Sequence, residues 1–374
     1  SYGVVMNSSV VDAWDVMLSR GDPLEVAKAA EAVIGFCHAQ QLRALHQVYV
    51  EAELGSDPDG VVVDPTPPEV ACAMVWTPGA AASMVDVAVD VVEDLPVVLA
   101  ALAEGRIDLG KVREITRATL GLSRADRQGL AERAIDYAAT RTRGQLRPWL
   151  TRQVDRIDPD AADRRRKHAR KRRRVSLTPE PDGMATLSAY LTAEEATACM
   201  ESIRARSTRI DGSRDASQAD TFIELLTGVS AAEQIPIAVI MTDDGAQIEG
   251  YGPIADAHAE DLLRRLELPS AIIRLTPPQF RIGYAPTVKM RRYVQVRDRH
   301  CRFPGCRRTA RSCDLDHIVA YPAGPTDVDN LQPLCRTHHR VKTHGGWHVE
   351  RGPNNTMIWT SPRGKRYTSH PDDP

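Results

Sequence analysis

Four side chains that commonly bind zinc occur as two close pairs in the C-terminal part of the sequence. Cys301 and Cys306 are separated by four residues, and Cys335 precedes His338 by three positions. Residues 303–305, Phe-Pro-Gly, provide the turn that a metal-binding knuckle requires. Two pairs of sulfur and nitrogen ligands from separate segments suit a tetrahedral ion that contributes directly to folding. The spacing therefore predicts structural Zn²⁺ held by these four residues.

A second set of polar side chains is interleaved with the first. Asp316 and His317 are adjacent in a segment typical of a β-strand, so their side chains should point to opposite faces. A strand, a loop and a helix would bring this pair together with His339. The set offers one carboxylate, one imidazole that can act as a base near neutral pH, and a second imidazole.

The helix that carries the last of these residues is expected to begin at about Leu331, after a turn over residues 327–330. His338 and His339 are neighbours on that helix, so their side chains diverge by roughly 100°. One histidine can therefore bind zinc while the other belongs to a different site.

The order and spacing of these residues resemble the HNH endonuclease family, which has a ββα-metal fold. The pattern is Cys-x4-Cys, Asp-His-Ile and Asp-Asn-Leu-Gln-Pro-Leu-Cys-x2-His-His-x2-Lys-Thr, and it extends over residues 301–343. The resemblance implies a metal-dependent endonuclease that binds DNA and hydrolyses its phosphodiester bonds.

The same resemblance implies a role for each residue of the second set. Asp316 and His339 would hold one catalytic divalent ion, Mg²⁺ or Mn²⁺, with Zn²⁺ or Ni²⁺ as alternatives. His317 would deprotonate the attacking water, and Asn330 would form a hydrogen bond that orients His317. A base with a pKa near neutral and an ion that stabilises charge on the phosphate suit this reaction.

One position departs from the family pattern. Many HNH sites have a further histidine one helical turn after the metal-binding one, whereas this sequence has Thr343 followed by His344. Either the ion has two protein ligands or His344 supplies a third. Lys342 is expected to contact phosphate, and neighbouring arginines, including Arg340, would form a rim for the DNA backbone.

The preceding chain predicts a mainly α-helical region and then an α+β region. It resembles the helical DUF222 region that accompanies HNH domains in actinobacterial proteins of the 13E12-repeat group. The segments that carry this weaker resemblance are Trp76-Thr77-Pro78, Leu95-Pro96, Gly105-Arg106-Ile107, Gly144-Gln145-Leu146-Arg147 and Gly250-Tyr251-Gly252-Pro253-Ile254. We expect a helical DUF222-like domain at 1–160, its basic and α+β continuation at 161–285, and an HNH domain at 286–374.

Positive charge is concentrated toward the C-terminus. From Val288 to Pro374 there are 16 lysines and arginines against 8 aspartates and glutamates, a net charge of +8. The whole chain carries −2, so the preceding residues carry −10. A separate basic run at 164–174 includes Arg172, Arg173 and Arg174; it is either a solvated helix face or a clamp on DNA phosphates.

The composition indicates a soluble globular protein, with 42% hydrophobic residues. We find no apolar run of the length that a membrane span needs and no signal peptide, so we expect a cytoplasmic protein without a membrane partner. In that compartment, clustered cysteines and histidines favour metal over disulfides. The sequence does not indicate an oligomeric state.

Three functional hypotheses follow from these patterns. The first is a metal-dependent DNA endonuclease. The second is a zinc-stabilised nucleic-acid-binding protein whose HNH module is not catalytic. In the third, the DUF222-like region performs the main function and the HNH domain is an accessory.

Overall fold

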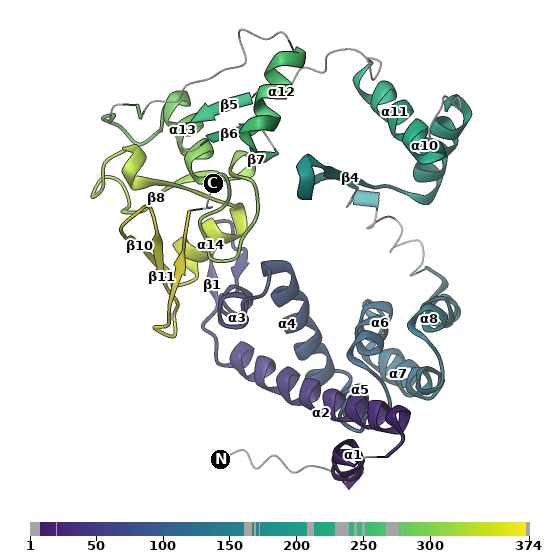
Figure 1. The fold of residues 1–374 in the computed structure, drawn as a ribbon. Coiled ribbons are helices and arrows are strands. Elements are labelled where there is room, and N and C mark those ends of the chain that lie inside the picture. Colours follow the sequence, from purple (N-terminus) through teal and green to yellow (C-terminus); the bar gives the residue numbers. More distant parts are fainter. Residues whose placement is uncertain are drawn as a thin grey trace.

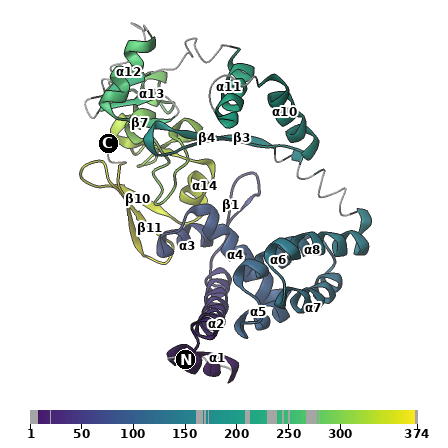
Figure 2. The same cartoon turned by 45° about the vertical axis from the view of Figure 1, so that its right-hand side comes forward.

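The computed structural model describes residues 8–19, 21–160, 167, 170–171, 173–207, 213–228, 239–242, 245–248, 251–266, 277–278 and 280–371. Most of the basic run at 164–174, including Arg172, therefore lies outside the described residues, whereas Arg173 and Arg174 lie inside. Figures 1 and 2 show a helical N-terminal region, a middle region of helices and small sheets, and a C-terminal region that packs against the first.

The N-terminal region is helical, as predicted. The longest helix, α2, begins after Asp22, whose side chain accepts a hydrogen bond from the Leu24 amide. Ser123 caps α7 in the same way, through the Asp126 amide. The helices are α1 (Ser8–Leu18), α2 (Pro23–Val50), α3 (Thr66–Met74), α4 (Pro78–Glu93), α5 (Pro96–Ala103), α6 (Leu109–Thr119), α7 (Arg124–Ala139) and α8 (Arg143–Ile157).

Buried aliphatic side chains hold helices α2 to α8 around a shared core. Leu42, Leu95, Leu102 and Ile115 are among the side chains with less than 2% exposure. The apolar residues between 85 and 102 are divided between two helices, because Pro96 lacks the amide donor that would continue α4 and instead begins α5. Among the described helices, none is by itself long and apolar enough to span a membrane; α3 and α4 pass that test only together, with a 116° bend between them.

The middle region contains two small antiparallel sheets. The first is a hairpin across residues 181–183, which place Leu177 opposite Leu187. In Figure 2 the hairpin extends toward β7, where the Tyr251 hydroxyl donates a 3.1 Å hydrogen bond to the Glu180 carbonyl. The elements are β3 (Arg174–Pro179), β4 (Ala185–Tyr190), α10 (Ala193–Arg206), α11 (Arg214–Thr227), β5 (Val239–Thr242), β6 (Gly245–Ile248), β7 (Gly252–Ile254) and α12 (Asp256–Leu266).

The C-terminal region consists of α13, a two-stranded sheet, one helix and a three-stranded sheet. The predicted helix start at Leu331 is wrong, because Leu331 begins strand β9, which pairs with β8 in antiparallel register. All four residues of β9 are buried, so pairing with β8 and burial decide its strand conformation, and the helix begins only after Cys335. The elements are α13 (Val288–Asp298), β8 (Asp314–His317), β9 (Leu331–Leu334), α14 (Arg336–His344), β10 (His348–Arg351), β11 (Met357–Thr360) and β12 (Arg366–Ser369).

A segment of the N-terminal region completes the C-terminal core. The hairpin of β1 (Gly55–Ser56) and β2 (Val62–Val63) lies against α14 (Figure 1). Val63 is buried with Trp347 and Trp359, and Cys72 of α3 packs against the same cluster. The Ser361 hydroxyl also donates a 2.7 Å hydrogen bond to Glu69. The two regions therefore share one packed interface.

Candidate metal centre and hydrolytic site

The four predicted zinc ligands converge inside the C-terminal region. One ligand atom from each of Cys301, Cys306, Cys335 and His338 lies within 4.8 Å of the others. His338 Nδ1 is 3.5 Å from Cys301 Sγ and 3.3 Å from Cys335 Sγ. Sulfur and nitrogen ligands of a tetrahedral zinc ion are separated by about 3.6 Å. These residues can therefore hold one metal ion, and their chemistry fits zinc.

Aromatic side chains fix the orientation of His338. The Phe303 ring stacks on the imidazole at a centroid distance of 4.0 Å and an interplanar angle of 12°. Phe303 also meets the edges of Trp347 and Trp359, both of which are 1% exposed or less. The Trp359 indole donates a 2.9 Å hydrogen bond to the Arg302 carbonyl. This small core positions both segments of the candidate metal centre.

The thiols of the cluster differ in their acidity. Hydrogen bonds from Cys301 and Cys306 lower the pKa of the Cys335 thiol far below its usual range, and His338 adds to the effect. Burial raises the pKa of Cys301. Zinc binds cysteine as thiolate, so metal binding to this cluster would release protons from its thiols.

The thiol of Cys313, a fourth cysteine in the same stretch of sequence, is not part of the ligand group. Its side chain is 6% exposed and packs in the same core as the cluster. Its sulfur lies 3.4 Å from the Thr309 carbonyl, to which it donates a hydrogen bond. A packing role therefore accounts for Cys313.

The second predicted set also comes together, on the face of β8 that meets α14. Asp316 Oδ1 lies 3.4 Å from His339 Nε2. Two ligands at 2.0–2.2 Å from one tetrahedral ion are about 3.4 Å apart, so this pair can share a divalent ion. Asp316 is buried, whereas the His339 side chain is 29% exposed, which leaves one side of the pair open to solvent.

Two neighbours hold the other oxygen of Asp316. Lys342 Nζ lies 2.8 Å from Oδ2, and Gln332 Nε2 donates to the same oxygen at 3.1 Å. Lys342 also donates to the His317 carbonyl at 2.5 Å. Lys342 is therefore already paired with Asp316, and its predicted contact with phosphate would have to share or replace this ion pair.

Asp314 is a site residue that sequence reasoning missed. Its Oδ2 accepts a 3.0 Å hydrogen bond from His339 Nδ1. Burial alone would raise the pKa of Asp314, but His339 and Arg336 outweigh it and lower that pKa. The contact leaves the His339 Nε2 lone pair directed at Asp316, the arrangement that carboxylates give to metal-binding histidines. The sequence contained a signal for this role, since residues two apart in a strand share a face and Asp314 precedes Asp316 by two positions.

His317 lies on the opposite face of β8, as predicted, and is 6% exposed. Its Nε2 lies 2.9 Å from the hydroxyl of buried Thr326. That hydroxyl has one proton, which it donates to the Gly283 carbonyl at 2.6 Å. The hydroxyl must therefore accept the Nε2 proton of His317, so the Nδ1 atom carries the free lone pair.

The surroundings of His317 also keep it neutral. Burial lowers the pKa of His317, an effect that Asp316 partly opposes and Lys342 reinforces. The ring stacks on Tyr284 at a centroid distance of 5.3 Å. A neutral imidazole with a defined tautomer can accept a proton at neutral pH.

Asn330 has different partners from those predicted. Its side-chain oxygen accepts from the Val319 amide at 2.9 Å, and its amide group donates to the carbonyls of Val319 and Pro325 at 2.9 and 2.8 Å. These bonds close the loop between β8 and β9. The expected hydrogen bond from Asn330 to His317 is therefore wrong. Thr326 contacts the imidazole instead, and Asn330 holds the loop between His317 and β9.

Arg340 and His344 lie on another face of α14. Arg340 Nε forms a 3.0 Å ion pair with Asp57 of the β1–β2 hairpin. The Val61 amide lowers the pKa of Asp57, and the charges of Arg340 and His344 lower it further. Arg340 thus joins the N-terminal and C-terminal regions. His344 lies on the same side of α14 as Arg340 and not on the side of His339. His344 therefore lies near the β1–β2 hairpin.

The described part of the basic run makes contacts within the chain. Arg173 forms an ion pair with Glu195 and donates a 3.1 Å hydrogen bond to the Arg170 carbonyl. The Arg174 guanidinium lies 4.9 Å from the centre of the Tyr190 ring. Both side chains remain in part exposed, so these contacts leave them accessible to a phosphate backbone.

Comparisons with known proteins match parts of the chain. A family model described as a domain of unknown function, DUF222, matches residues 23–221. An uncharacterized protein of Mycobacterium tuberculosis is 38% identical over 145 residues, which are 38% of this chain and 27% of the relative. A second from that species is 47% identical over 89 residues, 24% of this chain and 16% of the relative. No solved structure matches.

Longer but weaker matches occur in the same species. One uncharacterized protein is 26% identical over 285 residues, which are 62% of this chain and 60% of the relative. The chain therefore spans about a quarter of the first relative's length and about a sixth of the second's. It spans more than half of the third relative's length.

Proposed function

This chain belongs to the DUF222 family, and we propose that its C-terminal region, residues 286–374, is a metal-dependent DNA endonuclease of the HNH type. One observation carries the proposal: β8, β9 and α14 place Asp316 Oδ1 3.4 Å from His339 Nε2 while the adjacent His317 has its own buried partner. A metal-binding pair beside a neutral base suits the hydrolysis of phosphate esters.

In the proposed reaction, His317 Nδ1 accepts a proton from water as the water oxygen bonds to phosphorus. The bond from phosphorus to the 3′ oxygen breaks at the same centre. Asp316 and His339 would hold a divalent ion, which would supply Lewis-acid stabilisation of the charge on the phosphate and the leaving oxygen. Thr326 holds the His317 ring, and Asp314 holds the His339 ring. We also propose that the Cys301 cluster holds structural Zn²⁺.

The decisive experiment is incubation of the full chain with supercoiled plasmid across a panel of divalent metals. Nicked or linear products that appear with Mg²⁺ or Mn²⁺ and disappear with chelator support the proposal. Binding without cleavage under every metal would favour the non-catalytic alternative. The full chain is needed because Val63 and Cys72 contribute to the C-terminal core. Truncation near residue 285 would expose this shared core. The hypothesis that the DUF222-like region performs the main function is therefore better tested with Asp316→Asn, which changes the C-terminal site in the intact chain.

Zinc retention is the first expected result. Purified protein should contain about one zinc ion per chain without added metal, because four sulfur and nitrogen ligands are already gathered in the core. Elemental analysis measures this directly. Cys313→Ser is a matched control, since that thiol lies outside the ligand group and its loss should leave zinc content unchanged. Folded wild-type protein without zinc would refute the assignment.

Thr326→Val should reduce kcat by about tenfold or more, because it removes the hydrogen-bond acceptor that fixes the His317 tautomer. Thr326→Ser retains the hydroxyl and should stay within about threefold of wild type. Single-turnover plasmid cleavage, with zinc content as a folding control, distinguishes the two. Equal losses in both variants would indicate a packing role for the methyl group instead.

DNA affinity should fall steeply with salt. Replacing Arg173 and Arg174 by glutamine should reduce the slope of log affinity against log salt by about one unit for each DNA phosphate that these arginines neutralise. Arg204→Gln, an exposed arginine paired with Glu201, provides the control. Fluorescence anisotropy at several salt concentrations gives the slope. An unchanged slope in the double variant would assign these arginines to a solvated surface.

A further inference from the structure

Two exposed tyrosines lie beside His317, the base in the proposed reaction. Tyr284 is 67% exposed, and its ring stacks on the imidazole at a centroid distance of 5.3 Å and an interplanar angle of 30°. Tyr321 is 39% exposed, and its ring centroid lies 6.0 Å from that of Tyr284 and 6.2 Å from that of His317. We call Tyr284 and Tyr321 the tyrosine pair. Both rings are therefore at the surface and next to the buried imidazole.

The outer face of the Tyr284 ring is open to solvent. His317 stacks on the inner face. If Tyr321 lay over the outer face, its distance from His317 would be roughly the sum of the other two centroid distances. The Tyr321 ring is instead almost as close to His317 as to Tyr284, so it lies at the side of the stack. The high exposure of Tyr284 agrees with an uncovered outer face.

Hydrogen bonds fix the two loops that carry the tyrosine pair. The hydroxyl of buried Thr326 donates to the Gly283 carbonyl at 2.6 Å, and the Arg281 amide donates to the Thr326 carbonyl at 3.1 Å. The Asn330 side chain holds the other loop through the amide and the carbonyl of Val319. Because the backbone beside both rings is ordered by folding, a ligand on them would cost little further ordering.

The surroundings of the tyrosine pair are apolar and lie in a basic part of the chain. Ile282 and Val319 are both exposed, and each lies two residues from a tyrosine. Neighbouring exposed apolar side chains mark interaction sites, whereas single ones are ordinary. From Val288 to the C-terminus there are 16 lysines and arginines against 8 aspartates and glutamates. Nucleic acid fits both properties, since it combines an anionic backbone with bases that stack on aromatic rings.

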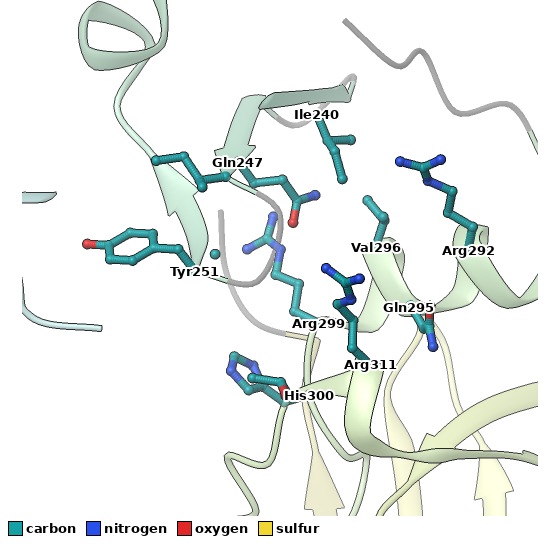
Figure 3. A pocket seen from close by; sticks show the side chains of 12 residues that line it. Ile240, Gln247, Tyr251, Arg292, Gln295, Val296, Arg299, His300 and Arg311 are labelled. Carbon is teal, nitrogen blue, oxygen red and sulfur yellow. The ribbon is translucent and has the colours of Figure 1, made fainter. Parts of the chain in front are cut away.

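The pocket between the β5–β7 sheet and α13 is a different feature of the same region. In Figure 3, Arg299 and Arg311 extend toward Gln247. Both arginines have interaction partners in the chain, as do Arg292 and His300 of the same lining. Their charges are therefore already engaged, and a DNA base has its open contact surface at the tyrosine pair instead.

A base can stack on Tyr284 only if it has left the duplex stack. In double-stranded DNA the neighbouring base pairs cover both faces of a base, so an enzyme must extrude it or act on DNA that is already unpaired. A base of a single strand or a loop has a free face, and every base has one that an aromatic ring can cover. Because a base and its own phosphate belong to one nucleotide, a base on Tyr284 brings a phosphate close to His317.

We propose that Tyr284, with Tyr321 at its side, binds an unpaired nucleobase next to the scissile phosphate. The inference rests on the proposed function and names its substrate class, which is DNA that is single-stranded or locally unpaired at the cleavage position. Stacking on the outer face of Tyr284 leaves the inner face against His317, so the base and the imidazole occupy opposite sides of one ring.

Fluorescence anisotropy of the full chain with a labelled single-stranded oligonucleotide, without added divalent metal, measures this binding apart from cleavage. A duplex of the same sequence is the comparison, and wild type should bind the single strand more tightly. Tyr284→Ala should weaken single-strand binding by about fivefold or more, the loss expected for one stacked base, and should leave duplex binding within about twofold. The salt slope should not change, because the substitution removes no charge.

Two further variants separate stacking from other effects. Tyr284→Phe keeps the ring and should bind the single strand within about twofold of wild type. Val288→Ala is the matched control, because it removes an exposed apolar side chain outside the tyrosine pair. Zinc content and thermal melting establish folding. A 2-aminopurine base in the strand reports stacking directly, and its quenching by wild type should be reduced in Tyr284→Ala.

The inference is overturned if wild type binds single strand and duplex equally, or if Tyr284→Ala weakens both to the same extent. A phenylalanine variant as weak as the alanine variant would assign the contact to the hydroxyl and overturn the stacking site. Binding of neither DNA form by wild type would also overturn it and would leave the apolar surface to a protein partner.

Plasmid cleavage separates the base-binding site from the proposed endonuclease activity. Tyr284-dependent binding of the single strand, without cleavage under any metal, would support the site and refute the activity. Cleavage by wild type, with Tyr284→Ala binding and cleaving as wild type does, would support the activity and overturn the site.

Discussion

His317→Ala is expected to reduce plasmid cleavage by about 10²- to 10⁴-fold, the usual contribution of a general base. The imidazole lies next to Asp316 in β8, and its bond to Thr326 defines which ring nitrogen carries the free lone pair. Its removal takes away no zinc ligand, so zinc content and DNA affinity should remain near those of wild type. Single-turnover cleavage at saturating protein gives the rate of the chemical step.

The controls separate loss of chemistry from loss of structure. His317 is buried and stacks on Tyr284, so alanine leaves a cavity that costs roughly 1–3 kcal/mol of unfolding free energy. His317→Gln fills more of that space and should be equally inactive. His348→Ala removes an exposed histidine of β10 and should retain activity. Wild-type cleavage by His317→Ala would eliminate the imidazole as the base.

Local signals account for the features that the sequence predicted well. The predicted helical character of the N-terminal region depends on such signals, since Asp22 and Ser123 cap their helices through residues within one turn. The zinc ligands occur as close pairs with a turn between the first two. The separation of Asp316 from His317 follows from strand alternation alone. In each case the chemistry depends on neighbours in the sequence.

Features that depend on distant segments were not predictable in the same way. Thr326 contacts His317 only because the Asn330 bonds close the loop between β8 and β9. The pairing of Arg340 with Asp57 depends on how the N-terminal hairpin docks on α14. The helix start predicted at about Leu331 is wrong for the same reason, because Leu331–Leu334 pairs with β8, a segment distant in the sequence. Long-range packing, and not local propensity, set the partners of these residues.

The adjacent histidines His338 and His339 should have opposite phenotypes. His338 Nδ1 faces two cysteine sulfurs in the buried core, whereas His339 Nε2 faces Asp316. His338→Ala should lose zinc and reduce the free energy of unfolding by about 4 kcal/mol or more, as expected when a structural metal is lost. His339→Ala should keep zinc and stability but lose metal-dependent cleavage.

Three measurements on both variants decide whether the two histidines belong to different ions. Elemental analysis gives zinc content, chemical denaturation gives stability, and plasmid cleavage across Mg²⁺ concentrations gives the function of the second site. Cys335→Ser should behave like His338→Ala, because it removes another ligand of the same cluster. Zinc loss in both histidine variants would place His339 in the zinc centre. Zinc retention in both would leave His338 as a packing residue against Phe303, so only the split result is consistent with two separate sites on one helix.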